Sequence, residues 1–120
     1  MKEFDDAMTS LGKGSQVTAF TASDFGRTLT SNGDGSDHGW GSHHFVMGGA
    51  VNGGKFVGTA PEIGLTHNQQ VGSGRLIPST AVDPLGAELA AWFGVSATDV
   101  KTVLPNAKNF DLYKLGLFKA

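Results

Sequence analysis

Residues 23–44, with the sequence SDFGRTLTSNGDGSDHGWGSHH, gather three aspartates and three of the four histidines of the chain. Glycines separate these side chains, and few apolar residues lie among them. Carboxylate oxygens and neutral imidazole nitrogens together suit zinc, iron or manganese. Glycine lets the backbone turn tightly enough for several ligands to meet at one ion. The composition therefore predicts a metal-binding loop.

The predicted metal ligands are Asp24, His38 and His43, and Asp37 would orient a histidine or act as a ligand itself. Adjacent residues of a strand point to opposite faces, so only one of His43 and His44 should face the loop. The cofactor would be a divalent metal, zinc first, with manganese, iron and calcium as alternatives. A metal-bound water ionises near neutral pH and can attack an ester, so we expect a metal-dependent hydrolase of ester, phosphoester or sulfoester substrates.

Arg27 and Ser42 complete the predicted catalytic set. Arg27 could hold the phosphate or sulfate group of a small anionic ester by a bidentate contact. Alternatively, it pairs with Asp34 or Asp37. Ser42 stands beside His43 and is a candidate nucleophile, although adjacency in sequence does not establish the geometry of a catalytic triad.

Two other interpretations of the same segment remain open. Residues 32–37 place oxygen ligands at alternate positions, as at the start of a calcium loop, but the sixth-position glycine and the closing glutamate are missing. The segment could also be a polar loop whose histidines hydrogen-bond to the backbone and hold turns. His67, isolated in THNQQ, is expected to be a solvated loop histidine.

Composition excludes several classes of function. The chain has 120 residues and a net charge of −2, with lysines and arginines scattered singly, so neither nucleic acid nor a membrane is an expected partner. Cysteine is absent, which excludes thiolate metal sites and thiol catalysis. No signal peptide or membrane-spanning run is recognisable, and the cellular location stays undetermined.

The elements that must position the site are predicted from periodicity. A short amphipathic helix carries Phe4, Met8 and Leu11 and ends before Gly12. The segment 16–23 has the pattern of a strand buried on both faces, as in a mainly parallel sheet, and such sheets bind ligands at the carboxyl ends of strands, where Asp24 stands. Further strands are expected at 43–49 and 53–58, joined by a hairpin turn at 51–54, and near 75–77.

The last third predicts two helices. Asp83 would cap a helix whose first residue is Pro84 and which ends at Gly94. Ser96 and Asp99 form a variant of the capping box at the start of a shorter helix, which Pro105 ends. The tail at 111–120 is apolar enough to dock on the domain or on another chain.

Three motifs in order carry a resemblance to a known family: TASDFGRT at 21–28, GSDHGW at 35–40 and GGAVNGG at 48–54. With Asp83, Trp92-Phe93-Gly94 and residues 103–106, they resemble the carboxy-terminal part of the bacterial domain-of-unknown-function family fifteen-oh-one, from about residue 17 to 110. That family is placed with the alkaline phosphatase and sulfatase-like superfamily.

The resemblance implies a fold and a set of ligands. By position, Asp24 matches the aspartate of the superfamily's Asp-His motif, Phe25 replaces the histidine, and His38 matches a histidine further downstream. The superfamily's nucleophile and first metal-binding aspartate lie in an amino-terminal half that has no counterpart here. Full-length relatives often carry a twin-arginine signal, which implies a periplasmic location for them.

We therefore expect a single α/β domain over residues 1–120, with a small, mainly parallel or mixed sheet and flanking helices, like the C-terminal portion of an alkaline phosphatase-like fold. An uncovered sheet edge would favour a homo-oligomer. The opposing hypothesis is a non-catalytic fragment or interaction module that holds a structural metal or none.

Overall fold

The computed structural model describes all 120 residues, and the chain forms two compact units. Unit 1 consists of residues 1–20, 46–58 and 80–120, and unit 2 consists of residues 21–45 and 59–79. Each unit is described by itself. No helix in either unit has both the length and the apolar composition needed to cross a bilayer.

The sheet of unit 1 is antiparallel, so the prediction of a mainly parallel sheet is wrong. Strand β1 (Thr18–Phe20) pairs with β4 (Val46–Gly48), and Thr18 lies opposite Gly48. A parallel pair needs a crossover connection, usually a helix, between its strands. The residues that follow β1 form a β-hairpin instead, and β4 returns antiparallel to β1.

The helices of unit 1 match the periodicity of the sequence. Helix α1 (Lys2–Ser10) is followed by the 3-10 helix η1 (Gly14–Gln16). Helix α2 (Val82–Phe93) ends at Gly94, whose φ of +104° is the left-handed conformation that glycine adopts at helix ends. Helix α3 (Ala97–Val103) begins after Ser96, whose hydroxyl accepts a hydrogen bond from the Asp99 amide, as predicted.

One predicted cap is wrong. Ala81 is the N-cap of α2 and makes no side-chain cap, while Asp83 lies inside the first turn. A carboxylate in the first turn still interacts favourably with the positive end of the helix dipole. Pro105 starts the 3-10 helix η2 (Pro105–Asn109) and ends α3 as expected.

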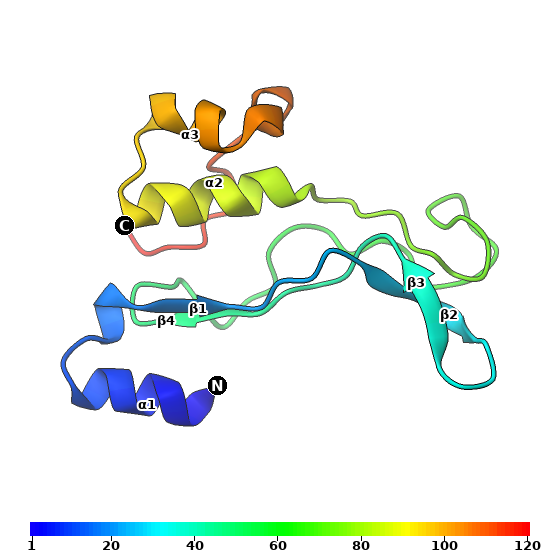
Figure 1. The fold of residues 1–120 in the computed structure, drawn as a ribbon, viewed down its shortest axis with the longest axis horizontal. Coiled ribbons are helices and arrows are strands. Elements are labelled where there is room, and N and C mark those ends of the chain that lie inside the picture. Colours follow the sequence, from blue (N-terminus) through cyan, green and yellow to red (C-terminus); the bar gives the residue numbers. More distant parts are fainter. The chain divides into compact units, whose positions relative to one another are not determined.

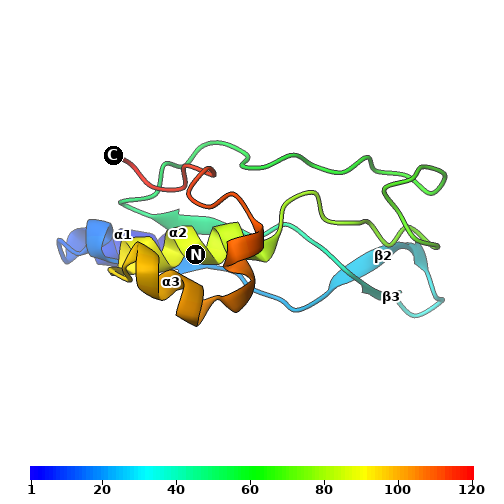
Figure 2. The ribbon, with the colours of Figure 1, turned by 90° about the horizontal axis from the view of Figure 1, so that it is seen from above.

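The core of unit 1 is small and helical. Ala87, Val100 and Ala107 are buried together, one each from α2, α3 and η2. Figures 1 and 2 both show α2 and α3 side by side, and in Figure 1 α2 lies between α3 and the β1–β4 sheet. Small side chains at the contacts let these short elements approach closely.

The tail docks on unit 1. Phe118 forms a β-bridge with Val51 and stacks on Trp92, with ring centroids 5.4 Å apart. The Glu88 carboxylate accepts hydrogen bonds from the amides of Leu115, Gly116 and Leu117, at 2.6, 3.1 and 2.8 Å. The predicted strand at 53–58 and its hairpin turn are absent, because the residues after β4 pair with the distant tail rather than with each other.

Unit 2 is built on a β-hairpin where the sequence predicted a loop. Strand β2 (Gly26–Ser31) pairs antiparallel with β3 (Ser36–Gly39), and Figures 1 and 2 show the two side by side. Asn32 closes the turn, because its amide donates to the Gly35 carbonyl and its side-chain oxygen accepts from the Asp34 amide. Between the pairs Arg27–His38 and Ser31–Ser36, β2 has three residues where β3 has only Asp37. The hairpin therefore carries a bulge in β2.

A second segment of unit 2 covers the other edge of β2. The amides of Leu29 and Thr30 donate to the carbonyls of Gly74 and Ser73. The strand predicted near 75–77 is reduced to a single bridge between Gln70 and Leu76. Residues 72–74 all have positive φ, so this segment turns too sharply to continue as a strand.

Candidate functional site

The exposed face of the hairpin joins three residues of the predicted site region. Arg27 lies opposite His38 in the register of β2 and β3, so their side chains share one face. The His38 ring stacks on Phe25, with centroids 4.0 Å apart and planes inclined by 15°. Arg27 Cζ lies 5.3 Å from the centre of the same Phe25 ring, within cation–π range. Phe25 thus contacts both the arginine and the histidine.

The Arg27 guanidinium retains free donors. Its Nη1 donates to the Ser36 carbonyl at 2.7 Å, and its other nitrogens have no protein partner. No carboxylate lies within ion-pair distance of it, so the predicted alternative pairing with Asp34 or Asp37 does not occur. An arginine fixed at one nitrogen and free at the others can bind an oxyanion.

Asp37 is held by groups other than histidine. Its Oδ1 accepts from Asn32 Nδ2 at 2.8 Å, and its Oδ2 lies 3.8 Å from Arg75 Nη2. Its amide donates to the hydroxyl of the buried Thr28. The carboxylate therefore stabilises the turn of the hairpin, and in this structure it orients no histidine.

The predicted metal ligands do not form a cluster of three side chains around one point. The structure contains no group of three or more histidine, aspartate or glutamate side chains that could hold a metal ion. Asp24 is exposed, and neither of its carboxylate oxygens has a hydrogen-bond or ion-pair partner. As placed, Asp24, His38 and His43 do not fit a three-ligand metal centre, so no reaction step is assigned to a metal.

A cavity of about 540 Å³ in unit 2 does collect part of the predicted set. Its volume lies within the range of about 300–1,000 Å³ that is usual for small-molecule sites. Its lining includes the predicted catalytic residues Arg27 and Ser42 and the predicted ligand His43. The polar lining consists of Thr21, Ser23, Arg27, Ser42, His43 and His44.

His43 and His44 precede β4 rather than lying in a strand. The strict alternation of faces expected for them does not apply, and both line the cavity. The His43 ring meets Phe45 edge-on at 5.9 Å. Ser42 is exposed, and no hydrogen bond joins it to a histidine in this structure. The cavity therefore contains a hydroxyl, two imidazoles and a guanidinium without a preformed triad.

Sequence reasoning missed Arg75. Its Nε donates to the His38 carbonyl and its Nη1 to the Gly72 carbonyl, so it ties the segment after residue 70 to β3. The isolated position of Arg75 among glycines in the sequence gave no signal of this role.

His67 was expected to be solvated but is half-buried. Its two ring nitrogens form hydrogen bonds with the Gly64 carbonyl and the Gln69 amide.

The fold and the cavity define a small α/β protein with an arginine-bearing pocket beside a β-hairpin. Residues 1–103 match the family described as "Protein of unknown function (DUF1501)". The chain belongs to this family. No match was found among curated proteins or among solved structures.

Proposed function

We propose that the chain acts in the hydrolysis of anionic esters, phosphoesters or sulfoesters, and that the cavity of unit 2 binds the anionic group. The observation that carries this proposal is the meeting of Arg27, Ser42 and His43 at one cavity. The resemblance of the sequence motifs to the alkaline phosphatase and sulfatase-like superfamily also favours it, while the family itself is described only as of unknown function.

Each residue has a role that its surroundings support. Arg27 binds the oxyanion with the guanidinium nitrogens that Ser36 leaves free. Ser42 is the candidate nucleophile, and His43 is the candidate base that would take its proton when a substrate draws the two together. Asp37 is a positioning residue, because it fixes the hairpin that carries Arg27.

A divalent metal, zinc first, belongs to the proposal through the superfamily resemblance of Asp24 and His38. The donor arrangement described above does not fit a three-ligand centre within this chain. The proposal therefore gives this chain the anion-binding part of the chemistry and assigns no step to the metal.

Hydrolysis of nitrophenyl phosphate, sulfate and acetate tests the proposal. The protein is assayed with added zinc, manganese or calcium and with a chelator, and metal content is measured in parallel. We expect turnover of at least one anionic ester and its loss in Arg27→Met, with folding unchanged by circular dichroism. Equal turnover by the wild type and Arg27→Met, or none with any ester or metal, contradicts the proposal.

A non-catalytic interaction module is the second candidate function. It is supported by a cavity of about 510 Å³ in unit 1, whose apolar lining includes Phe20, Trp92 and Phe93. Phe93 is 82% exposed, and the buried hydroxyl of Thr18, which also lines this cavity, has no hydrogen-bond partner. Copies of the chain that associate through this face would form the homo-oligomer expected from the sequence.

Light scattering after size exclusion distinguishes this second function. A module of this kind predicts a dimer or larger species that Phe93→Ser converts to monomer, with ester hydrolysis absent throughout. A monomeric wild type at concentrations up to about 100 μM, where a micromolar interface would be saturated, contradicts it.

A further inference from the structure

The residues that line the cavity of unit 2 fall into two chemical groups, which we call the polar wall, consisting of the polar lining residues named above, and the apolar wall. The apolar wall consists of four large apolar side chains, namely Phe25, Leu29, Ile63 and Leu76. They come from three separate segments, namely the residues around β2, the loop near residue 63 and the bridge at residue 76. A ligand that fills the cavity must therefore meet both kinds of surface.

Two residues of this apolar wall are exposed to solvent and two are half-buried. Ile63 is 70% exposed and Leu29 is 46% exposed. Phe25 is half-buried because His38 and Arg27 lie on its ring. Exposed apolar side chains gain most from a ligand, since burial removes their surface from water.

The arginine and the apolar wall are held together by the backbone. Phe25 directly precedes β2, and Arg27 and Leu29 lie within it, so all three side chains come from one short stretch of chain. Gly26, between Phe25 and Arg27, lies so close to the Gly41 carbonyl that any side chain there would collide with it. This close approach places Gly41 against the start of β2, and the lining residues Ser42, His43 and His44 follow Gly41 directly in the chain.

We infer that the cavity selects amphiphilic anionic monoesters, in which a sulfate or phosphate group binds Arg27 and an alkyl or aryl group packs on Ile63, Leu29 and Phe25. This inference rests on the proposed function and names its substrate class. A bare inorganic anion would use only the polar wall, and a neutral hydrocarbon would leave the guanidinium unpaired. The two walls together favour a molecule with both parts.

Calorimetric titration of the full chain with methyl, butyl and hexyl sulfate, and with the matching phosphates, tests the inference. All are used far below micelle formation. Full burial of one methylene gives about fourfold tighter binding, so we expect at least about twofold for each methylene added on this partly open wall. The sulfate and phosphate series show which oxyanion the polar wall prefers.

Two variants separate the walls. Ile63→Ser should weaken hexyl sulfate binding about tenfold and leave methyl sulfate binding unchanged. Val71→Ser is the control, because Val71 is an exposed β-branched apolar residue of unit 2 that does not line the cavity. Arg27→Met should abolish binding of both sulfates.

The outcomes distinguish failure of this inference from failure of the proposed function. Arg27-dependent binding of methyl sulfate that gains nothing from a longer chain overturns the inference and leaves the anion site standing. Chain-length dependence that persists in Arg27→Met, or that appears equally with hexyltrimethylammonium, means non-specific adsorption and overturns both. Absence of binding by every ester also overturns both.

Discussion

The imidazole of His38 lies parallel to the ring of Phe25, 4.0 Å away between centroids. The proposed resemblance to the alkaline phosphatase and sulfatase-like superfamily implies a metal-binding histidine at the place of Phe25. In this chain the aromatic ring gives His38 a packing partner at that position. The stack therefore ties Phe25 to the hairpin that carries Arg27.

Replacement of Phe25 by leucine should weaken the hairpin. Leucine keeps apolar volume but removes the stack on His38 and the contact with Arg27, and an aromatic pair contributes about 0.5–1.5 kcal/mol beyond its buried area. We expect unit 2 to lose about that much stability. The His38 ring protons should also lose an upfield ring-current shift in the NMR spectrum. An unshifted His38 spectrum in both proteins would show that the stack does not form in solution.

Gly26→Ala should destabilise unit 2, because the added methyl group would collide with the Gly41 carbonyl. Forced overpacking of this kind costs about 1–3 kcal/mol. Gly53→Ala is the control, since a methyl group at Gly53 would meet no atom within 4 Å. Urea denaturation should show a lower midpoint for the first variant only, and equal midpoints would refute the close approach.

Glu88→Gln should release the tail of unit 1. Glu88 is 7% exposed, and its three hydrogen bonds join it to residues 115–117. Loss of bonds to a buried charged group costs about 1–3 kcal/mol. Hydrogen exchange at those three amides should accelerate, whereas the exposed Glu62→Gln should leave them protected. Unchanged protection in Glu88→Gln would mean that the carboxylate does not hold the tail.

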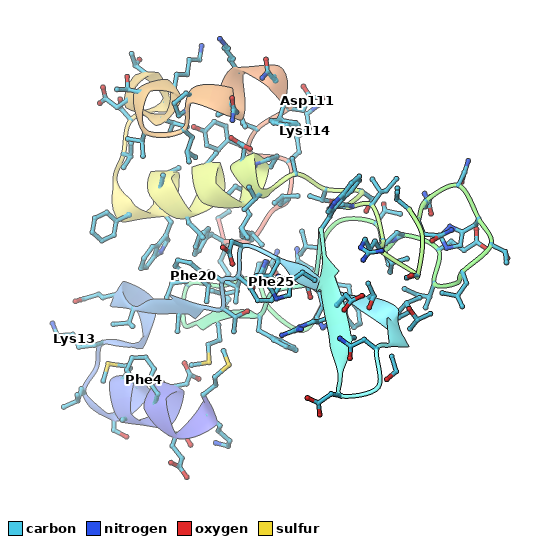
Figure 3. All side chains as sticks on the ribbon, turned by 45° about the vertical axis from the view of Figure 1, so that its right-hand side comes forward. Phe4, Lys13, Phe20, Phe25, Asp111 and Lys114 are labelled. Carbon is cyan, nitrogen blue, oxygen red and sulfur yellow. The ribbon has the colours of Figure 1, made fainter.

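The Asp111 carboxyl should titrate below its usual range. A hydrogen bond from Lys114, reinforced by the positive charge of that residue, lowers the pKa of Asp111 (Figure 3). Because the folded-state pKa is depressed, the pair stabilises the fold above the unfolded pKa, and this contribution is lost as the pH falls through the folded value. NMR titration should find the Asp111 pKa raised in Lys114→Met, and identical values in both proteins would exclude the pair.

The helices could be predicted from the sequence because local signals define them. The apolar spacing of Phe4 and Met8, the Ser96 cap and Gly94 act within a few residues of the elements that they delimit. The sheet could not be predicted in the same way. β1 and β4 are joined through a long intervening segment, and Val51 pairs with Phe118 across most of the second half of the chain.

The hairpin of unit 2 did have a local signal. Asn32-Gly33 followed by Asp34-Gly35 is typical of a tight turn between strands, but the aspartates and histidines around it favoured a metal loop. The turn uses the polar groups of Asn32 for its own hydrogen bonds, and the bulge places Asp37 beside Arg75. Composition alone therefore predicted a polar segment correctly but not which of its side chains would meet.

The most direct test of the anion site uses the two arginines of the chain as probe and internal control. Arg75 Nε already donates to the His38 carbonyl, whereas Arg27 is held only through Nη1. When methyl sulfate or methyl phosphate is titrated into the labelled protein, the side-chain Nε–H signal of Arg27 should shift to saturation while that of Arg75 stays still. No shift at Arg27, or equal and unsaturable shifts at both arginines, would contradict the assignment of this cavity to an anionic ester.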